Sequence, residues 1–185
     1  MIIGNFIKGI KLKDKNYHFS GLCFNSAKCK KDNIFFAIKG SKINGNKFIN
    51  DAIQKGAKII ISNLKFEGIK KNTLFIKSTN VRKTLSEFAY KIHKNKPKNI
   101  IAVTGTNGKS SVADFYFQIL KLNKKRVASI GTLGIKTQNY IRKVSNTTID
   151  PITLSIELNK LKKEKIDDVI LEASSHGLKQ NRLDG

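Results

Sequence analysis

Residues 103–111 read VTGTNGKSS, and they join an apolar segment, 99–103, to an amphipathic one, 109–122. The order predicts a strand, a loop and a helix, which is the setting that a phosphate-binding loop requires. Gly105 and Gly108 allow backbone conformations and close approaches that a Cβ atom would prevent. The N–H groups of the loop and of the helix N-terminus can then face an anion.

Two side chains of this loop can act on a nucleotide. Lys109 can reach the β- and γ-phosphates, and the hydroxyl of Ser110 can bind Mg²⁺. Val103 stands where the general Walker pattern has its first glycine, which makes a generic kinase or GTPase a less favoured interpretation. A strand-to-helix turn that contains Gly-Lys-Ser by chance is the structural alternative. The predicted ATP-binding set, with Lys109 as its catalytic residue, is Gly105, Thr106, Asn107, Gly108, Lys109, Ser110 and Ser111.

Two strand and helix alternations surround the loop. Before it, the apolar and amphipathic patterns predict a strand at 34–38, a helix at 47–55, a strand at 57–61 and a helix from Val81 that ends at Lys96-Pro97. We place a domain boundary there. After it, the same patterns predict a strand at 99–103, a helix at 109–122 with Val112, Phe115, Ile119 and Leu120 on one face, a strand at 126–130, a helix that Asp150 caps at Pro151, and a strand at 168–172. The alternation predicts an α/β fold with mainly parallel sheets.

Composition limits the classes of function. The net charge of +23 raises the prospect of a nucleic-acid partner, but only four of the 36 basic residues are Arg, and the Lys residues are scattered. Abundant Lys, Asn and Ile together are typical of an AT-rich genome. The positive field still favours small polyanions such as nucleotides.

Two cysteines, Cys23 and Cys29, are too few for a disulfide framework, so we expect reduced thiols. No apolar segment is long enough for a membrane span or a signal peptide, so we expect a cytoplasmic protein.

Two further motifs identify a resemblance. Residues 146–148 read NTT, and residues 172–182 read EASSHGLKQNR. Together with the loop, with Phe24-Asn25-Ser26 and with the segment 33–45, they resemble the MurE type of the Mur ligase family over roughly residues 21–185. The TGTNGKS loop is similar to the variant that Mur ligases share with folylpolyglutamate synthetases.

The resemblance implies two domains: an N-terminal domain at 1–96 that binds a UDP-linked precursor, and a truncated central ATP-binding domain at 97–185. It implies ATP and Mg²⁺ as cofactors, with Ser110 and Glu172 as metal ligands. The implied precursor-binding residues are Phe24, Ser26, Ser41, Lys42, Ile43, Asn146, Thr147, Thr148, Ser174, Gln180 and Arg182.

The activity implied is ligation in peptidoglycan synthesis. ATP would phosphorylate the D-glutamyl carboxylate of UDP-N-acetylmuramoyl-L-alanyl-D-glutamate, and the amine of meso-diaminopimelate or L-lysine would attack the acyl phosphate. The partners expected are small molecules, without nucleic acid or membrane, and the protein is expected to be a monomer. The family's third domain has no counterpart before Gly185, so we expect the chain as given to be incomplete for catalysis. Asn25-Ser26-Ala27 also departs from the family's frequent Asp-Ser-Arg.

Several alternatives stay open at this point. Ser174 and Ser175 could cap a turn, and Thr147 and Thr148 could be ordinary loop hydroxyls. His176 could orient its loop or contact a ligand. Glu172 is harder to explain structurally, since a buried carboxylate without a partner is costly and a cation would explain it. For the whole chain, the rival functions are a folylpolyglutamate synthetase, a Mur ligase of another step, and a basic nucleic-acid-binding module.

Overall fold

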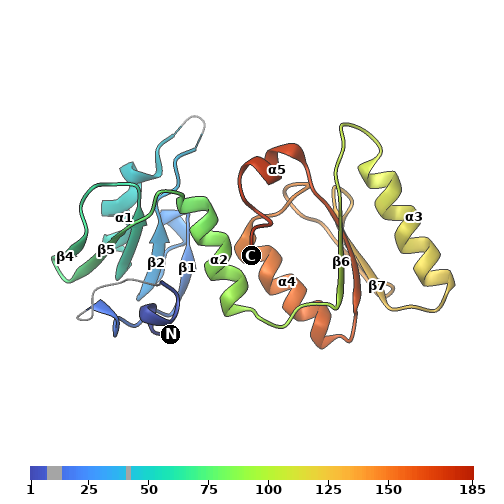
Figure 1. Ribbon diagram of the computed structural model, residues 1–185, viewed down its shortest axis with the longest axis horizontal. Helices are drawn as coiled ribbons and strands as arrows, with labels where there is room; N and C mark the ends of the chain where they lie inside the picture. Colours follow the sequence, from blue (N-terminus) through green and yellow to red (C-terminus); the bar gives the residue numbers. More distant parts are fainter. Residues whose placement is uncertain (8–13, 41–42) are drawn as a thin grey trace. The chain divides into compact units, whose positions relative to one another are not determined.

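A computed structural model describes residues 1–7, 14–40 and 43–185. The chain forms two compact units, Met1–Phe88 and Ala89–Gly185, and the division falls within helix α2 (Val81–Ile92). Within the described residues each unit holds one five-stranded sheet (Figure 1). The predicted α/β class with parallel sheets is confirmed. The expected domain boundary at 96/97 lies just beyond α2, in the segment that leads to the next strand.

The first sheet has the strand order β1-β2-β3-β5-β4. Its bounds are β1 Gly21–Cys23, β2 Asn33–Phe36, β3 Ile59–Ser62, β4 Gly68–Lys70 and β5 Thr73–Lys77. The strands pair in parallel except for β4, which is antiparallel to β5. All residues of β2 and β3 are buried, which is why their sequences read as continuous apolar runs rather than as alternating patterns.

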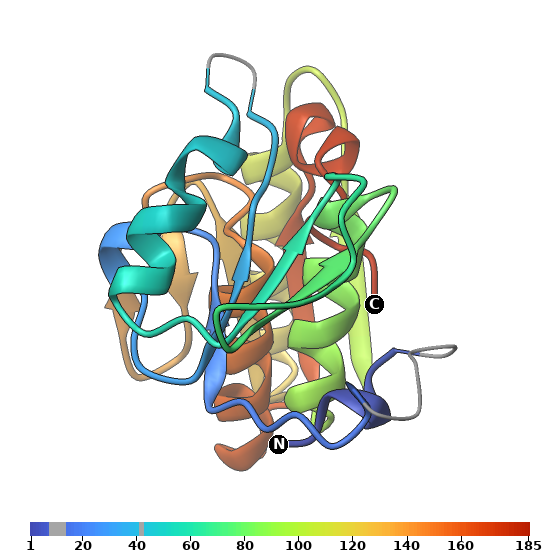
Figure 2. The same cartoon turned by 90° about the vertical axis from the view of Figure 1, so that its left-hand side faces the viewer.

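Different side chains cover the two faces of this sheet. Helix α1 (Ile49–Gln54) contributes Ile49 and Ala52 to a core with Phe35 and Ile60, and Figure 2 shows α1 in teal. Phe36 points the other way and meets Phe88 of α2, with ring centroids 5.5 Å apart. The prediction of one helix at 47–55 is wrong in its first turn, because residues Gly45–Phe48 form a 3-10 helix (η4) that Asn44 caps.

The second sheet has the strand order β6-β10-β7-β8-β9. Its bounds are β6 Asn99–Val103, β7 Val127–Gly131, β8 Gly134–Lys136, β9 Ile141–Arg142 and β10 Asp168–Glu172. Strands β6, β10 and β7 are parallel, and β8 and β9 are antiparallel additions. The register pairs Glu172 with Val103, so the carboxyl ends of β6, β10 and β7 meet at one edge, where ligands bind in open α/β sheets.

Helices α3 (Lys109–Leu122) and α4 (Pro151–Lys163) cover opposite faces of the second sheet (Figure 1). Asp150 caps α4 by accepting from the Thr153 N–H, with Pro151 in the first turn, as the sequence predicted. Side chains Leu154, Leu158 and Leu161 of α4 lie in the core with Ala128, Ile130, Val169 and Leu171 of the sheet.

Helix α3 buries a narrower face than its sequence predicts. Its buried side chains are Ala113 and Phe117, one turn apart. Val112, Phe115 and Ile119 are 50%, 63% and 57% exposed, and Leu120 is half-buried. The predicted apolar face is therefore not the face that packs on the sheet. Successive helical residues are about 100° apart, so the row through 113 and 117 turns the neighbouring apolar row away from the strands.

Candidate functional site

A cavity of about 310 Å³ lies at the carboxyl edge of the second sheet. The phosphate loop, the first turn of α3, the end of β10 and the segments after β7 and β9 all contribute to it. Nine of its ten lining residues belong to the sets predicted from the sequence, and Thr132 is the addition. The lining residues are Thr106, Asn107, Gly108, Lys109, Ser110, Ser111, Thr132, Thr147, Glu172 and Ser174.

The phosphate loop is held in a shape that requires glycine. Gly105 and Gly108 have φ of 149° and 80°, both in the region that favours glycine, and Gly108 directly precedes α3. The Lys109 ammonium folds back and donates to the carbonyl oxygens of Gly105 at 2.7 Å and Thr106 at 3.2 Å. Lys109 therefore closes its own loop, with its charge beside the helix N-terminus, where the backbone dipoles also favour an anion.

Glu172 ends β10, and the residue is only 3% exposed. The Ser110 hydroxyl donates to its Oε2 at 3.0 Å, and the Thr132 N–H donates to its Oε1 at 3.0 Å. These hydrogen bonds satisfy the carboxylate, so burial by itself does not require a cation here. The structure brings Ser110 and Glu172, the two predicted metal ligands, into direct contact.

Thr132 is the cavity residue that the sequence reasoning missed. It follows β7 immediately, and besides its N–H it places its hydroxyl 3.0 Å from Glu172 Oε2 and 2.9 Å from Thr147 Oγ1. Gly131 makes this contact possible, because a Cβ atom there would lie 2.1 Å from Glu172 Oε1. The Gly-Thr pair at the end of a predicted strand was the available signal, since carboxyl ends of neighbouring parallel strands meet at one edge.

Thr148 and Ser174 tie the segment after β9 to the end of β10. The buried Thr148 hydroxyl is 2.9 Å from the Glu172 carbonyl oxygen and 3.0 Å from Ser174 Oγ, and it accepts from the Ser174 N–H. Ser174 also caps α5 (Ser175–Lys179) by accepting from the Gly177 N–H at 3.1 Å. Ser174 is thus both a helix cap and a cavity residue. Thr148 does not line the cavity, but its hydroxyl holds Ser174 in position.

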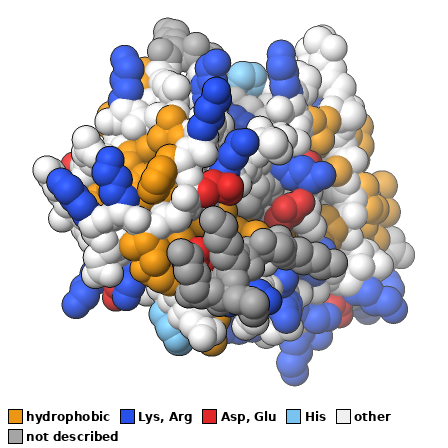
Figure 3. All heavy atoms as spheres, turned by 60° about the vertical axis from the view of Figure 1, so that its left-hand side comes forward, with side chains coloured by type: hydrophobic (Ala, Val, Ile, Leu, Met, Phe, Trp, Pro, Cys, Tyr) orange, Lys and Arg blue, Asp and Glu red, His pale blue; other side chains and the backbone are white. Residues whose placement is uncertain are grey.

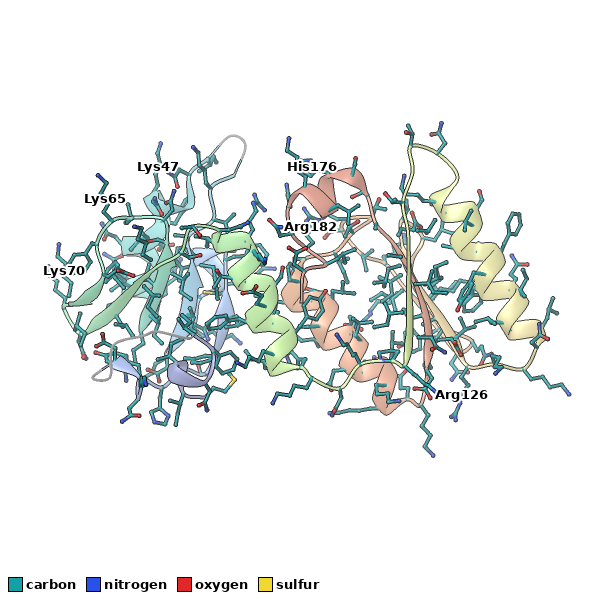
Figure 4. The ribbon with its side chains drawn as sticks, viewed as in Figure 1. Lys47, Lys65, Lys70, Arg126, His176 and Arg182 are labelled. Carbon is teal, nitrogen blue, oxygen red and sulfur yellow. The ribbon has the colours of Figure 1, made fainter. Side chains whose placement is uncertain are left out.

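Gln180 and Arg182 do not line the cavity, but they are connected by hydrogen bonds to Thr148. The Arg182 guanidinium donates to the Thr148 carbonyl oxygen and, from Nε and Nη2, to Gln180 Oε1 at 3.0 and 2.7 Å. The side-chain amide of Gln180 also contacts His176 Nε2 at 2.6 Å, and Figure 4 shows His176 and Arg182 on the same side of the second unit. Asn146 is exposed, with its side chain on Ser145 Oγ.

The predicted precursor-binding residues of the first unit are held differently. Phe24 and Ile43 are 41% and 56% exposed, while Ser26 is buried. The Ser26 hydroxyl donates to Asp51 of α1, and this bond, followed by the contact with Lys55, lowers the pKa of Asp51. Two further predicted residues, Ser41 and Lys42, lie outside the described residues.

A divalent cation fits the second unit. Ser110, Thr132 and Glu172 present hard oxygen donors beside the phosphate loop, as Mg²⁺ requires. In the part of the chain that the structure describes, no cluster of three His, Cys, Asp or Glu side chains could hold a metal ion alone. A Mg²⁺ ion at this site would therefore take its remaining ligands from phosphate and water, which is the usual arrangement for Mg²⁺ with nucleotides.

Among the side chains that the structure describes on the face drawn in Figure 3, Lys and Arg are spread among neutral and apolar ones rather than gathered in one basic stripe. This agrees with the scattered Lys pattern of the sequence. Cys23 and Cys29 are both buried thiols outside any disulfide. None of the described helices is both long and apolar enough to cross a membrane.

Comparison with known families gives two matches. A profile described as "Mur ligase family, catalytic domain" matches residues 18–100, and one described as "Mur ligase middle domain" matches residues 103–185. The UDP-N-acetylmuramoyl-L-alanyl-D-glutamate–2,6-diaminopimelate ligase of Rickettsia prowazekii is 42% identical over 91% of this chain and 36% of the relative. The ligase of the same name from Zymomonas mobilis is 38% identical over 96% of this chain, again 36% of the relative. The chain thus spans about a third of their length.

Solved structures agree with these relatives. A structure of a UDP-N-acetylmuramoyl-L-alanyl-D-glutamate–2,6-diaminopimelate ligase superposes with a TM-score of 0.81 at 27% identity, over 100% of this chain and 38% of that one. A MurF ligase from Thermotoga maritima in complex with ADP gives a TM-score of 0.54 at 20% identity, over 83% of this chain and 32% of that one. At that lower identity the likeness shows the fold alone.

Proposed function

The chain belongs to the Mur ligase family, and from this premise we propose that it carries the nucleotide site and the acceptor site of an ATP-dependent amide ligase. The acceptor proposed is UDP-N-acetylmuramoyl-L-alanyl-D-glutamate and the amine proposed is 2,6-diaminopimelate, since the relatives are named for these two substrates. L-lysine, the other amine that the sequence left open, has no support from those names.

One observation carries the proposal. The phosphate loop, the Glu172 carboxylate and the hydroxyls of Thr147 and Ser174 line a single cavity. A phosphoryl transfer needs a cradle for the nucleotide phosphates beside a place for the acceptor carboxylate. Lys109 at the first turn of α3 supports the first requirement, and the hydroxyls across the cavity support the second.

The reaction divides into two steps. An oxygen of the D-glutamyl carboxylate attacks the γ-phosphorus, the bond from this phosphorus to the β-γ bridging oxygen breaks, and ADP leaves. The amine then attacks the acyl carbon, loses a proton and expels inorganic phosphate. Lys109 and the N–H groups of the loop neutralise charge on the phosphates, and Thr147 and Ser174 orient the acceptor oxygens, so catalysis rests on positioning and charge. When bound, Mg²⁺ supplies further charge neutralisation at the transferred group.

Binding measurements on the 185-residue chain test this function. Calorimetry with Mg²⁺ and a non-hydrolysable ATP analogue, and separately with UDP-N-acetylmuramoyl-L-alanyl-D-glutamate, should give saturable binding of each. A DNA duplex added as competitor should leave both affinities unchanged. Displacement of both ligands by DNA, with an affinity that falls steeply as salt is raised, would instead support a basic nucleic-acid-binding module.

A further inference from the structure

The direction of the hydrogen bonds around Thr132 can be assigned. A hydroxyl group has a single hydrogen, and an ionised carboxylate only accepts. The Thr132 hydroxyl lies 3.0 Å from Glu172 Oε2 and 2.9 Å from Thr147 Oγ1. Its hydrogen therefore points to Glu172, and Thr147 donates its own hydrogen to Thr132. The Thr132 hydrogen is thus used by the carboxylate, and the Thr147 hydrogen is used by Thr132.

We propose that Thr132 is a positioning residue that couples the nucleotide site to the acceptor site, by reversing the hydrogen bond between its hydroxyl and that of Thr147. This inference rests on the proposed function, because it requires a cation with nucleotide on one side of the cavity and an anionic acceptor on the other. It assigns a role to a residue that neither the sequence motifs nor the family resemblance identified.

The reversal follows from charge. A divalent cation held by Glu172 would repel the hydrogens of the Ser110 and Thr132 hydroxyls, which would then turn away from the carboxylate. The Thr132 hydroxyl has Thr147 Oγ1 as its neighbour at 2.9 Å, so it donates there. Thr147 lines the cavity, and its hydrogen is then released to donate to an anionic oxygen of the acceptor, where a charge-assisted bond is strong.

The Thr132 N–H and the Glu172 carboxylate keep their positions while the hydroxyl hydrogens reorient. The Thr132 N–H holds Glu172 Oε1 at 3.0 Å, and a backbone donor cannot rotate away as a hydroxyl does. Gly131 leaves no space between β7 and the carboxylate, since even a Cβ atom would overlap it. These two contacts hold the carboxylate in place, whereas the hydroxyl hydrogens can rotate.

The test measures the coupling between the two ligands in the 185-residue chain. Calorimetry gives the dissociation constant of UDP-N-acetylmuramoyl-L-alanyl-D-glutamate with and without saturating Mg²⁺ and non-hydrolysable ATP analogue. Thr132→Val removes the hydroxyl but keeps the shape and the N–H, and Thr132→Ser restores the hydroxyl. Thr153→Val in the exposed first turn of α4 is the matched control, as it makes the same change in the same unit away from the cavity.

For the unchanged chain we expect the nucleotide to tighten acceptor binding by about fivefold or more, in the usual range of coupled sites. The ratio should fall toward one in Thr132→Val and survive in Thr132→Ser and Thr153→Val. Linkage requires the acceptor to tighten nucleotide binding by the same factor, which checks each measurement. If Thr132→Val does not fold, Thr147→Val breaks the same hydrogen bond from its other end and should abolish the coupling.

The outcomes separate the two ideas. A chain that binds both ligands but shows equal coupling with and without the Thr132 hydroxyl overturns this inference and leaves the proposed function standing. A chain that binds neither Mg²⁺ with nucleotide nor the acceptor overturns the proposed function, and this inference with it.

Discussion

The two units hold their predicted binding residues in different ways. In the second unit, Ser110, Glu172 and Thr147 belong to one hydrogen-bonded row through Thr132, and all of them line one cavity. In the first unit, Phe24 and Ile43 are exposed, and Ser26 is buried against Asp51. The residues predicted for the second unit thus form a preorganised site, whereas those predicted for the first unit are held separately.

The difference fits the ligands that the family resemblance implies for the two units, which are nucleotide phosphates for the second unit and a UDP-linked precursor for the first. Phosphate is bound largely by backbone N–H groups at a loop and a helix N-terminus, and a short local motif is enough to place those groups. A pyrimidine base and its sugar are bound by individual side chains on loops, whose positions depend on contacts far apart in the sequence. Phosphate loops are therefore easier to predict than base pockets.

Lys109→Ala should have the largest effect of the substitutions considered. Loss of the ammonium should weaken binding of Mg²⁺ with ATP analogue by about 100-fold, since hydrogen bonds to charged groups are worth about 1.5–3 kcal/mol each. Acceptor binding measured alone should stay near its original affinity. Lys121→Ala, near the far end of the same helix, is the control. Unchanged nucleotide affinity in Lys109→Ala would reject this loop as the ATP site.

Gly131→Ala tests whether the second site is as tightly built as its contacts indicate. The new methyl would lie 2.1 Å from Glu172 Oε1, so the carboxylate must move and lose the Thr132 N–H. Overpacking of this kind typically costs about 1–3 kcal/mol, to be read from urea unfolding together with weaker nucleotide binding. Ser129→Ala, two residues earlier on β7, should change both quantities less. Equal effects of the two substitutions would mean that the carboxylate is not constrained.

The sequence predicts the helices and parallel strands of the second unit better than its antiparallel strands β8 and β9. The bounds predicted for 99–103, 109–122 and 168–172 coincide with β6, α3 and β10, because apolar runs there are bordered by Gly, Pro or charged residues. Strands β8 and β9 have three and two residues, which is too short for any periodic pattern. Each is paired with an antiparallel neighbour, β8 with β7 and β9 with β8.

The candidate site shows the same limit. Lys109 and Ser110 could be predicted because their roles follow from neighbours within a few residues. Thr132 was missed because its partners Glu172 and Thr147 are 40 and 15 residues away in sequence, and its position at the end of a strand was the one local signal. The two interpretations offered for Ser174 were both incomplete, because one hydroxyl caps α5 and also lines the cavity.

Arg182→Ala separates the acceptor side of the second site from its nucleotide side. The guanidinium fixes the Thr148 carbonyl oxygen and the Gln180 side chain, so its loss should loosen the segment that carries Thr147. We expect acceptor affinity to fall by about tenfold, near the lower end for a charged hydrogen bond, with nucleotide affinity unchanged. Arg126→Ala, at the opposite end of the unit (Figure 4), is the control. An equal loss for both ligands would contradict this division.

Ser26→Ala should have the smallest effect, and a pH titration shows it most clearly. The Ser26 hydroxyl is the main cause, ahead of Lys55, of the lowered pKa of Asp51. Because this pKa is lower in the folded chain than in the unfolded one, the contact contributes stability above the ordinary pKa of 3.8 and loses it as pH falls through the folded value.

In Ser26→Ala the pKa of Asp51 should rise toward 3.8, as followed by NMR of the carboxyl carbons. Asp114 in the second unit, whose pKa is lowered by Lys136 and then Gln118, provides the internal control and should titrate as before. UDP affinity should also fall in Ser26→Ala if the hydroxyl contacts the UDP-linked precursor, as the family resemblance implies, as well as Asp51. A changed Asp51 pKa with unchanged UDP affinity would make Ser26 a support of α1 alone, and the first unit's site would then have to rest on other side chains.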